Sequence, residues 1–566
     1  MKKDYSNWSK EELIKELRNV EKRKKYGIVW EDKPEQVALL CKEKLPILEE
    51  NVSKEIMTDK EKPTHVLIEG DNYHTLSVLN YTHKGKIDVI YIDPPYNTGA
   101  KTWKYNNNYV DKEDQWRHSK WLSFMEKRLK LAKNLISNKG FLICSIDDNE
   151  LFSLGLLLDE IFGENNRVGL ITVLHNPKGR NFTKWFSANS EYMLVYAKDS
   201  SIASFNEIAL DEEIKKTFNL IDEKGKNYRL EPLMRSRTET LRKNKPRFWY
   251  PIYVSKDLKH ISLKKIEGYS EVFPIAANGK EATWINLPET FEEKNKEKMF
   301  IAKLEDKKIQ IYRKFYEQQI LKNVWTDKKY QSEFHGTNLL KELLGKNIFE
   351  YPKSLWLLVD ILKITSKKNS TILDFFAGSG TTGHAVLELN KNDKGTRKFI
   401  LSTNNENNNG NGGGIAEEVC YPRIKKVISN LKKESNEKLV KNMPGNLKYF
   451  KTSFIDAEPT DKNKREMVEK STEMLCLKED CFEEVKKEKN FKIFSNNQGK
   501  MLGIVYDDEG IELFKKEVKE INKKFVVYIF SLDESAREEE FEDVKKLVEL
   551  KPIPAVILNV YKRIFK

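Results

Sequence analysis

The chain contains 566 residues, of which 39% are hydrophobic, 11% aromatic and 33% charged. A chain this long exceeds one ordinary hydrophobic core, so about two to four domains are expected. The apolar and aromatic content is high enough to bury real cores, which excludes a disordered protein. No stretch approaches ~18 uninterrupted apolar residues, so no membrane-spanning helix is expected.

Lysine and arginine together number 100 against 87 acidic residues, which gives a formal net charge of +13. A basic excess of this size favours a polyanionic partner such as nucleic acid, but a solvated lysine-rich surface gives similar totals. The five cysteines are scattered and complete no zinc site, so we expect free thiols and no metal. Free thiols, together with an N-terminus that lacks a signal pattern, indicate a cytoplasmic protein.

The first 60 residues are expected to be helical, because Ser9 and Glu12 form a capping-box pattern ahead of apolar residues at helical spacing. Beyond them, short apolar runs alternate with helical patterns, which predicts a parallel sheet covered on both faces. The last two of these runs have the pattern of an antiparallel edge pair. The predicted strands are residues 65–68, 88–92, 141–146, 168–174 and 192–196.

This alternation fades between residues 201 and 345, where basic residues and aromatic residues lie side by side. Basic groups for phosphates next to aromatic rings for stacking are what a nucleic-acid surface needs. The alternative is a solvated basic face beside an edge strand. The candidate DNA-binding residues are Arg235, Arg237, Arg242, Lys243, Lys245, Arg247, Trp249 and Tyr250.

The α/β pattern returns with a helix at 355–364 and a strand at 371–376, and another strand is predicted at 398–402. An Asn/Gly tract at 404–414 has the composition of a loop. After about residue 445, charged helical patterns separate further apolar runs, which predicts a separate small α/β domain. These runs are residues 502–506, 525–531 and 555–560.

A glycine-rich turn follows the strand that ends at Asp374, with glycines at positions 378 and 380. Glycine lets a ligand approach the backbone closely, and the following helix directs its N-terminus at that ligand. The turn matches neither a P-loop nor a complete dinucleotide fingerprint. Alone, it is equally typical of a tight turn without a ligand.

A second motif, Asp93-Pro94-Pro95-Tyr96, ends a buried strand. Two prolines fix φ and remove two amide donors, which leaves carbonyls free to accept from a substrate. The Asp93 carboxylate and an adjacent carbonyl can accept both hydrogens of one amino group, and Tyr96 offers a face to a planar base. The alternative is a rigid turn after a strand.

Together these two motifs resemble a known family. Asp93 to Gly99 is similar to the catalytic motif of amino-methylating DNA methyltransferases, and Phe376 to Thr382 is similar to their S-adenosylmethionine loop. The catalytic motif comes first, as in the permuted β class, and residues 60–440 with the region around 528–532 resemble the Mod subunit of type III restriction–modification systems. Two such motifs in one order, each at a strand end, are far more specific than either alone.

The resemblance implies an α/β fold: a Rossmann-like, S-adenosylmethionine-dependent methyltransferase sheet, circularly permuted, with an inserted target-recognition domain. If both strand groups join one sheet, Asp93 and Asp374 lie close together at the edge where ligands bind. The expected domains are 1–60 (N-terminal helical segment), 61–200 (catalytic half), 201–345 (target recognition), 346–444 (cofactor-binding half) and 445–566 (small C-terminal α/β domain).

The resemblance also implies catalytic roles. Asp93 and the Pro94 carbonyl accept the two hydrogens of a flipped-out adenine's amino group, Pro95 stiffens the turn, and Tyr96 stacks on the base. Asp71 holds the cofactor's adenine, Asp374 lies near its amino group, and Glu406 binds its ribose hydroxyls. Lys353 lies in a segment, 351–354, that resembles the family's element before the cofactor strand. The alternative is that Lys353 is an exposed lysine beside a proline turn. The implied cofactor-binding residues are Asp71, Lys353, Asp374, Phe376, Gly378, Gly380, Thr381 and Glu406.

The expected function is site-specific methylation of adenine N6 in double-stranded DNA, as the modification subunit of a restriction–modification system. The resemblance implies a homodimer and a separate restriction (helicase–nuclease) subunit. Methylation of cytosine N4 is an alternative, because the same two acceptors serve either exocyclic amine. A non-catalytic DNA-recognition subunit and a protein or RNA methyltransferase are further alternatives, and the large basic insertion favours DNA over protein or RNA.

Overall fold

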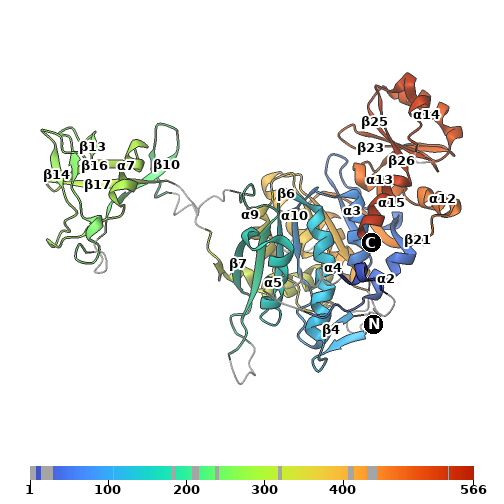
Figure 1. Cartoon of the computed structure of the whole chain (residues 1–566), viewed down its shortest axis with the longest axis horizontal. Coiled ribbons are helices and arrows are strands. Elements are labelled where there is room, and N and C mark those ends of the chain that lie inside the picture. The colour runs from blue at the N-terminus through green and yellow to red at the C-terminus, as the bar shows by residue number, and fades with distance from the viewer. Residues whose placement is uncertain are drawn as a thin grey trace. The chain divides into compact units, whose positions relative to one another are not determined.

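The computed structural model describes residues 8–14, 30–105, 108–179, 186–206, 216–235, 241–316, 321–405, 414–429, 443–532 and 535–565. Two compact units are present (Figure 1). The main unit comprises residues 1–206 and 322–566, and the inserted unit comprises residues 207–321. The inserted unit therefore lies within the segment 201–345 that the sequence sets apart.

The main unit is built on one ten-stranded sheet with the order β1-β21-β2-β20-β19-β3-β6-β8-β7-β18. From β21 to β6 neighbouring strands are parallel, whereas β8 runs antiparallel to both β6 and β7. Both the parallel sheet and the antiparallel edge pair match the sequence prediction. The strands are β1 (Lys44–Glu50), β2 (Thr64–Glu69), β3 (Ile87–Ile92), β6 (Ile136–Ile146), β7 (Arg167–Leu174), β8 (Ser190–Ala197), β18 (Val324–Trp325), β19 (Thr371–Asp374), β20 (Lys398–Thr403) and β21 (Asn446–Asp456).

Strand β19 joins the two halves of the sequence, because it lies between β20 and β3. Its residues Ile372 and Leu373 pair with Val89 and Ile90 of β3. Segments 281 positions apart in the chain (374 − 93) are thus neighbours in one sheet. The carboxyl ends of β3 and β19 consequently lie at the same edge.

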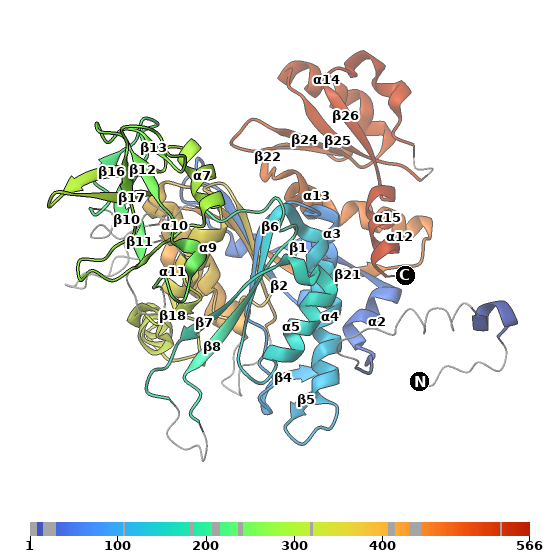
Figure 2. The same cartoon turned by 60° about the vertical axis from the view of Figure 1, so that its left-hand side comes forward.

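Helices cover both faces of this sheet (Figure 2). Strand residues alternate between the two cores: Ile90 and Ile92 pack on one side, and Val89 and Tyr91 pack on the other. Burial on both faces explains the nearly continuous apolar runs in the sequence. One face carries α3 (Asn72–Thr82), α4 (Arg117–Leu135) and α5 (Leu151–Phe162), and the other carries α9 (Leu355–Thr365), α10 (Thr381–Asp393) and α11 (Tyr421–Ser429).

The N-terminal segment differs in part from the helical expectation for residues 1–60. The Ser9–Glu12 capping box is present, with the Glu12 amide donating to Ser9 Oγ at 3.2 Å and the Ser9 amide donating to Glu12 Oε2 at 2.9 Å. However, helix α2 (Gln36–Glu43) leads into strand β1, which pairs antiparallel with β21. Residues 45–48 are buried, so an apolar strand edge replaces the expected helix.

The C-terminal segment forms a five-stranded sheet, β22 to β26 in chain order, and belongs to the main unit rather than to a separate one. The apolar run at residues 555–560 lies in helix α15, which packs against α3 and β26. Tyr561 of α15 donates from its hydroxyl to the Pro46 carbonyl of β1 at 2.5 Å. The elements are α12 (Asp461–Glu469), α13 (Thr472–Glu479), β22 (Glu483–Lys487), β23 (Phe491–Ser495), β24 (Met501–Val505), α14 (Ile511–Ile521), β25 (Phe525–Phe530), β26 (Val548–Ile553) and α15 (Ala555–Ile564).

The inserted unit has its own small core, which contains Ile252, Trp284, Phe291 and Ile311. Its strands form separate sheets of four, three and two strands around helix α7 (Pro288–Lys296). Across the described parts of both units, no helix has the length and apolar character to cross a bilayer. The strands are β9 (Leu220–Ile221), β10 (Asn227–Pro232), β11 (Met234–Arg235), β12 (Ile252–Val254), β13 (Ile261–Ser262), β14 (Ser270–Val272), β15 (Thr283–Trp284), β16 (Phe300–Glu305) and β17 (Lys308–Tyr316).

Candidate active site

The Asp93-Pro94-Pro95-Tyr96 turn follows β3 directly and is fixed by its surroundings. The buried Trp121 of α4 donates from Nε1 to the Pro95 carbonyl at 2.7 Å. Asn97, in a left-handed conformation with φ of 55°, donates to the buried Glu150 carboxylate at 2.5 Å. No hydrogen bond from the described residues reaches the Pro94 carbonyl. The turn therefore fixes the Pro94 carbonyl in place and leaves it available to accept a hydrogen bond.

Asp93 faces a buried lysine that comes from a distant part of the chain. Lys353 Nζ lies 3.3 Å from Asp93 Oδ1 and 2.5 Å from Glu191 Oε2. It also donates to the Tyr96 hydroxyl, which in turn donates to Glu191 Oε2 at 3.1 Å. Three elements, the end of β3, the start of β8 and the turn before α9, meet in this cluster of Asp93, Tyr96, Glu191 and Lys353, which we call the carboxylate–lysine cluster.

The structure places Lys353 beside the catalytic motif and excludes the alternative of an exposed lysine. The sequence assigned it to the cofactor or to an exposed turn, but its side chain is 10% exposed and contacts the catalytic motif. Asp93 keeps 26% of its side-chain surface accessible, whereas its Oδ1 is buried without a hydrogen bond from the described residues. A substrate can therefore reach the carboxylate from one side while the lysine approaches from the other.

The charges of this cluster depend on one another. Burial raises the pKa of Asp93, and the nearby Lys353 ammonium opposes that rise. Burial works against the ammonium of Lys353, but Asp93 and Glu191 together raise its pKa above the ordinary value. Burial likewise opposes ionisation of Glu191, yet Lys353 brings the pKa of Glu191 below its ordinary value. The lysine is thus held as a cation between two carboxylates.

The glycine turn lies one strand away from this cluster. Asp374 ends β19, and its carboxylate accepts from the Phe376 amide at 3.0 Å and from Thr382 Oγ1 at 2.5 Å. Burial raises the pKa of Asp374 to about 7. Gly378 and Gly380 have φ of 48° and 76°, and a Cβ on Gly380 would lie 3.0 Å from Cys420 Sγ. Glycine is therefore needed at 380 for both conformation and space.

Thr381 and the rest of the turn are held by a buried arginine. Arg423 of α11 donates from Nη1 to Thr381 Oγ1 at 2.7 Å and to Ser379 Oγ at 3.1 Å. The buried Thr381 hydroxyl therefore shapes the turn from inside. Glu406, expected on the ribose hydroxyls, lies outside the described residues.

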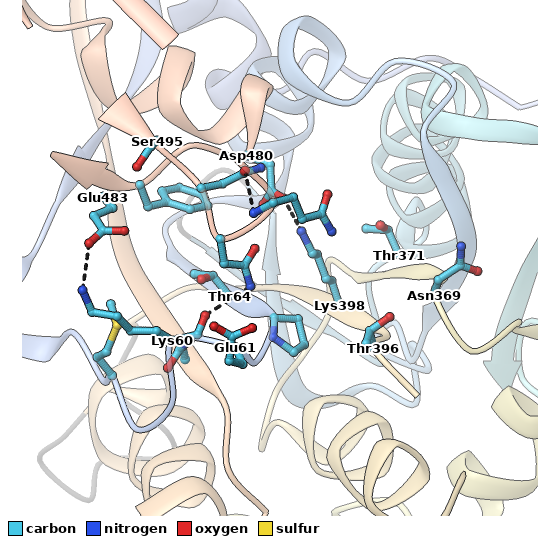
Figure 3. A pocket seen from close by; sticks show the side chains of 17 residues that line it. Lys60, Glu61, Thr64, Asn369, Thr371, Thr396, Lys398, Asp480, Glu483 and Ser495 are labelled. Atoms are coloured by element: carbon cyan, nitrogen blue, oxygen red, sulfur yellow. Dashed lines mark hydrogen bonds and ion pairs between the residues drawn. The ribbon is translucent and has the colours of Figure 1, made fainter. Parts of the chain in front are cut away.

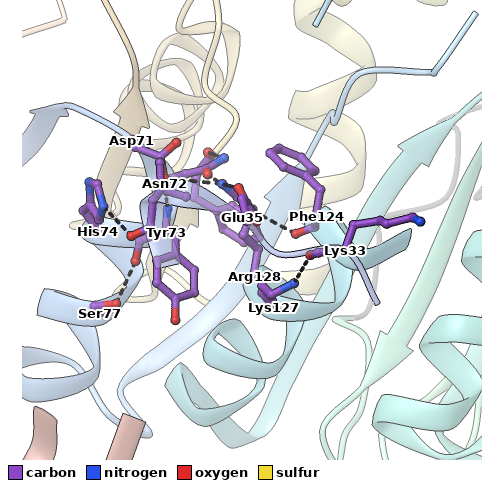
Figure 4. A network of polar contacts seen from close by, with 12 residues as sticks. Lys33, Glu35, Asp71, Asn72, Tyr73, His74, Ser77, Phe124, Lys127 and Arg128 are labelled. Atoms are coloured by element: carbon purple, nitrogen blue, oxygen red, sulfur yellow. Dashed lines mark hydrogen bonds and ion pairs between the residues drawn. The ribbon is translucent and has the colours of Figure 1, made fainter. Parts of the chain in front are cut away.

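Asp71 belongs to a polar network centred on Arg128 (Figure 4). Arg128 is fully buried and binds Glu35 through two hydrogen bonds of 3.0 and 2.7 Å. It lies 3.4 Å from Asp71 Oδ1 and donates to Asn72, whose Nδ2 donates to the Phe375 carbonyl at 3.1 Å. The network thus links the ends of β2 and β19, and it brings Asp71 to the edge that carries the glycine turn.

Comparison with known proteins identifies the family. A family model described as "DNA methylase" matches residues 87–408, which is more than half of the chain. The chain belongs to the DNA methylase family. The match includes both the Asp93 motif and the glycine turn, and it confirms the methyltransferase fold expected from the sequence.

Three curated relatives cover most of the same region. The chain is 30% identical to the type III restriction–modification enzyme EcoPI Mod subunit of Escherichia phage P1, over 68% of this chain and 64% of that protein. It is 33% identical to the type II methyltransferase M.KpnI of Klebsiella pneumoniae, over 59% and 79%. It is 30% identical to the StyLTI Mod subunit of Salmonella typhimurium, over 68% and 60%. The chain therefore spans less than two thirds of the length of these two Mod subunits.

The predicted DNA-binding residues lie in the inserted unit of this DNA methylase. Arg235, Arg242, Lys243 and Arg247 are exposed, and Lys245 is partly so. Arg242 pairs with Glu281 at 2.8 Å and covers the Trp249 ring, which stacks on Phe273. Arg237 lies outside the described residues.

Tyr250 differs from the expectation of an available stacking face. Its hydroxyl donates to the Asn286 carbonyl at 2.9 Å, and its ring packs edge-on against Phe291 in the core of the inserted unit. Its backbone carbonyl accepts from Trp284 Nε1 at 2.8 Å. Tyr250 therefore stabilises the inserted unit, and the exposed basic residues around it are the better candidates for DNA contact.

A cavity of about 450 Å³ lies away from these residues (Figure 3). It is lined by Thr64, Thr371 and Lys398, which begin β2, β19 and β20, so it opens at the amino ends of the strands. The Asp93 motif and the glycine turn lie at the opposite, carboxyl edge. The cavity is thus separate from the candidate active site, and its two lysines, Lys60 and Lys398, are paired with Glu483 and Asp480.

The sequence interpretation missed Glu191, Trp121 and Arg128. Glu191 immediately precedes the predicted strand 192–196, where a single acid is an ordinary residue, and nothing local pairs it with Lys353. Arg128 and Trp121 lie within a helical pattern that contains other basic and aromatic residues. The one sequence signal for Arg128 is its position within the apolar stripe of α4, because an arginine that is buried there needs a charged or polar partner.

Proposed function

We propose that this chain transfers a methyl group from S-adenosylmethionine to N6 of an adenine flipped out of double-stranded DNA. The observation that carries the proposal is the pair of acceptors at the end of β3. The Asp93 carboxylate is accessible, and the adjacent Pro94 carbonyl accepts no hydrogen bond from the part of the chain that the structure describes; both lie at the same sheet edge as the glycine turn. An exocyclic amino group offers two N–H donors, which fits two adjacent acceptors.

The residues at the end of β19 fit the proposed cofactor. Asp374 provides a buried carboxylate for an ammonium group, and Gly378 and Gly380 keep the backbone open at the start of α10. Asp71, at the end of β2, lies within reach of the same edge. When bound, S-adenosylmethionine supplies an electrophilic methyl group on a sulfonium sulfur. We assign its binding to Asp71, Asp374, Phe376, Gly378 and Gly380.

The chain's own residues account for activation of the amine. The lone pair of an adenine amino nitrogen is delocalised into the ring, so the nitrogen is a poor nucleophile. Acceptance of both N–H hydrogens by Asp93 and the Pro94 carbonyl favours the tetrahedral nitrogen, which is a form of transition-state stabilisation. Tyr96, held by Lys353 and Glu191, presents a fixed ring on which the flipped base stacks.

Methylation of labelled duplex DNA tests this proposal. The purified chain is incubated with random-sequence duplex and methyl-labelled S-adenosylmethionine, and the product nucleosides are identified by mass spectrometry. We expect N6-methyladenine. If the product contains only N4-methylcytosine, the chain methylates cytosine N4 instead of adenine N6. DNA that stays unlabelled would contradict both activities.

The variant Asp93→Ala separates catalysis from binding. It removes one of the two acceptors, so we expect methyl transfer to fall at least about a thousandfold. Cofactor affinity, measured by calorimetry, should stay within about twofold, because Asp93 is not among the residues assigned to the cofactor. Loss of cofactor binding together with activity would show that Asp93 acts elsewhere.

The Mod relatives support one further part of the proposal: we assign the chain to a restriction–modification system in which a separate helicase–nuclease subunit performs restriction. We also assign target recognition to the inserted unit, on the ground of its exposed basic residues. The expected assembly of the chain alone is a homodimer. Light scattering on the purified protein checks the assembly, and a monomeric mass at micromolar concentration would contradict it.

A further inference from the structure

The carboxylate–lysine cluster is more elaborate than a two-acceptor site requires. Lys353 comes from the turn at 351–354, and this turn is itself fixed. Ser354 Oγ donates to the Lys329 carbonyl at 2.7 Å, and a Cβ on Gly336 would lie 2.2 Å from the Pro352 carbonyl. The ammonium group therefore has a defined position beside Asp93.

We propose that Lys353 and Glu191 are positioning residues for Asp93: the ammonium keeps the Asp93 carboxylate ionised and oriented, and Glu191 limits how strongly it does so. This inference rests on the proposed function. Lys353 lies 3.3 Å from Asp93 Oδ1 but makes its closer contact, 2.5 Å, with Glu191 Oε2. The lysine therefore balances the charge of Asp93 without forming a close hydrogen bond to its carboxylate. The accessible side of that carboxylate stays open to substrate.

The chemistry of the amine explains why the ionised state matters. A carboxylate accepts hydrogen bonds with both oxygens, whereas a protonated carboxyl group presents a donor. A protonated Asp93 would direct that donor at an amino group that is itself a donor. Burial raises the pKa of Asp93, so without a cation beside it this carboxyl would tend to take up a proton.

The other charged and titratable groups near the cluster do not supply this cation. Tyr91 and Tyr96 of the same segment and the Cys144 thiol of β6 are neutral, because burial raises the pKa of each well above its ordinary value. Asp374 of β19 adds a further acid near Asp93. Among the described residues around Asp93, Lys353 is thus the cation in contact with it. The groups that face Asp93 or its two partners are Tyr91, Tyr96, Cys144, Asp147, His175, Glu191, Lys353 and Asp374.

Opposite changes in the pH–rate profile distinguish this role from a purely structural one. In Lys353→Met the cation is lost, so the acidic limb of kcat should move to higher pH by at least about one unit. In Glu191→Gln the lysine interacts with Asp93 alone, so the limb should move to lower pH. Lys353→Arg retains the cation and should keep the acidic limb near that of the unchanged protein, even if kcat falls.

The measurements are single-turnover methylation rates from about pH 5.5 to about pH 9, with cofactor affinity measured in parallel. Cofactor affinity of Lys353→Met should stay within about twofold of the unchanged protein, since Lys353 touches Asp93 and not the glycine turn. Limbs that do not move, or that move in the same direction in both variants, would overturn the proposal. If Lys353→Met fails to fold, the shift in Glu191→Gln decides.

Failure of this proposal and failure of the proposed function give different results. If the unchanged protein methylates no DNA, the proposed function is wrong. If it forms N6-methyladenine but the variants keep its pH profile, only the role of Lys353 and Glu191 is wrong. If Lys353→Met loses cofactor affinity at every pH, Lys353 acts at the cofactor, as the sequence suggested.

Discussion

The ionisation of Asp374, the acid that precedes the glycine turn, is set by burial of its side chain. Burial raises its pKa to about 7, and only the ionised form can pair with the ammonium group of the proposed cofactor. As the pH falls from about 7.5 to about 5.5, the carboxylate takes up a proton, so affinity for S-adenosylmethionine should fall, by up to about tenfold per pH unit. Calorimetric titration across this range measures the effect.

The matched variant for this prediction is Asp374→Asn, which keeps the shape of the side chain and removes its titration. It should bind the cofactor weakly, with an affinity that does not change over the same pH range. An unchanged protein whose affinity is equally flat would show that Asp374 is ionised throughout or does not contact the cofactor.

At the scale of single residues, local sequence identifies some members of the site and not others. Asp93, Gly378 and Gly380 stand in contiguous motifs whose residue types have a physical reason to occur together. Lys353 and Glu191 have no such local pattern, because their roles arise only when β8 and the turn before α9 meet β3. A lysine after a proline is ordinarily solvent-exposed, and its burial here depends on two acids from distant segments.

At the scale of elements, the glycine turn before α10 requires a left-handed backbone. The φ of 76° at Gly380 costs a residue with a Cβ roughly 1–2 kcal/mol, and the added atom would also crowd Cys420 Sγ at 3.0 Å. Gly380→Ala is therefore expected to lower the free energy of unfolding and to weaken S-adenosylmethionine binding at least about tenfold. Chemical denaturation and calorimetry measure the two effects.

Gly85→Ala is the control for this substitution. Gly85 has a similar φ of 67°, but a Cβ there meets nothing within 4 Å, and it lies in the turn before β3 rather than in the glycine turn. Its free energy of unfolding should fall by a similar backbone penalty while cofactor affinity is unchanged. Equal losses of cofactor affinity in both variants would mean that Gly380 acts through general stability alone.

Helix α4 carries a buried ion pair that connects three segments of the main unit. Replacement of Arg128 by methionine leaves Glu35 buried without its guanidinium partner, which should cost about 3–5 kcal/mol of unfolding free energy. Asn72 and Asp71 also lose a partner, so we expect weaker cofactor binding. Urea denaturation and calorimetry measure both effects.

Lys130→Met on the same helix is the matched control. Lys130 forms an exposed pair with Glu126 one turn away, and such pairs contribute about 0.3–0.5 kcal/mol. The control should therefore unfold nearly as the unchanged protein does and bind the cofactor normally. A similar small loss in both variants would show that the Arg128 network does not hold the ends of β2 and β19.

The elements of the sheet were predictable where a strand is buried on both faces, since β2, β3, β6, β19 and β20 appear as continuous apolar runs. Two elements were not. Strand β1 contains Pro46 and follows a helix without a break, so its pattern does not differ from a helical segment. Residues 555–560 are as apolar as a strand but form the first turns of α15, which packs against α3 and β26.

At the scale of the whole molecule, the sheet brings together two motifs that lie far apart along the chain. The catalytic motif precedes the cofactor turn by 281 positions (374 − 93), yet β3 and β19 are adjacent strands. The chain leaves this sheet after β8 and returns before β18, and residues 207–321 form the inserted unit between these points. Composition predicts that the insertion exists, but its longer strands β10, β16 and β17 are largely not buried, so they lack the continuous apolar runs by which the main-sheet strands are recognised.

The basic surface of the inserted unit gives a prediction for the complete protein. Lys243, Lys245 and Arg247 are charged and at least partly exposed, and each would neutralise one DNA phosphate in the proposed complex. Their joint replacement by alanine should weaken binding to duplex DNA. The slope of log Kd against log salt should also fall by about two to three, because about 0.9 counterion is released per phosphate contact. Cofactor affinity should not change, since these residues belong to a different unit.

The control for this prediction removes three lysines elsewhere. Lys516, Lys523 and Lys524 are exposed in the C-terminal part of the main unit, so their replacement changes the net charge by the same amount. Fluorescence anisotropy with a labelled duplex at several salt concentrations compares the two triple variants. Equal losses of affinity would indicate that DNA responds only to the net charge of +13. A loss confined to the first variant would support the inserted unit as the DNA-binding surface, since only a local contact changes the salt slope while the total charge is matched.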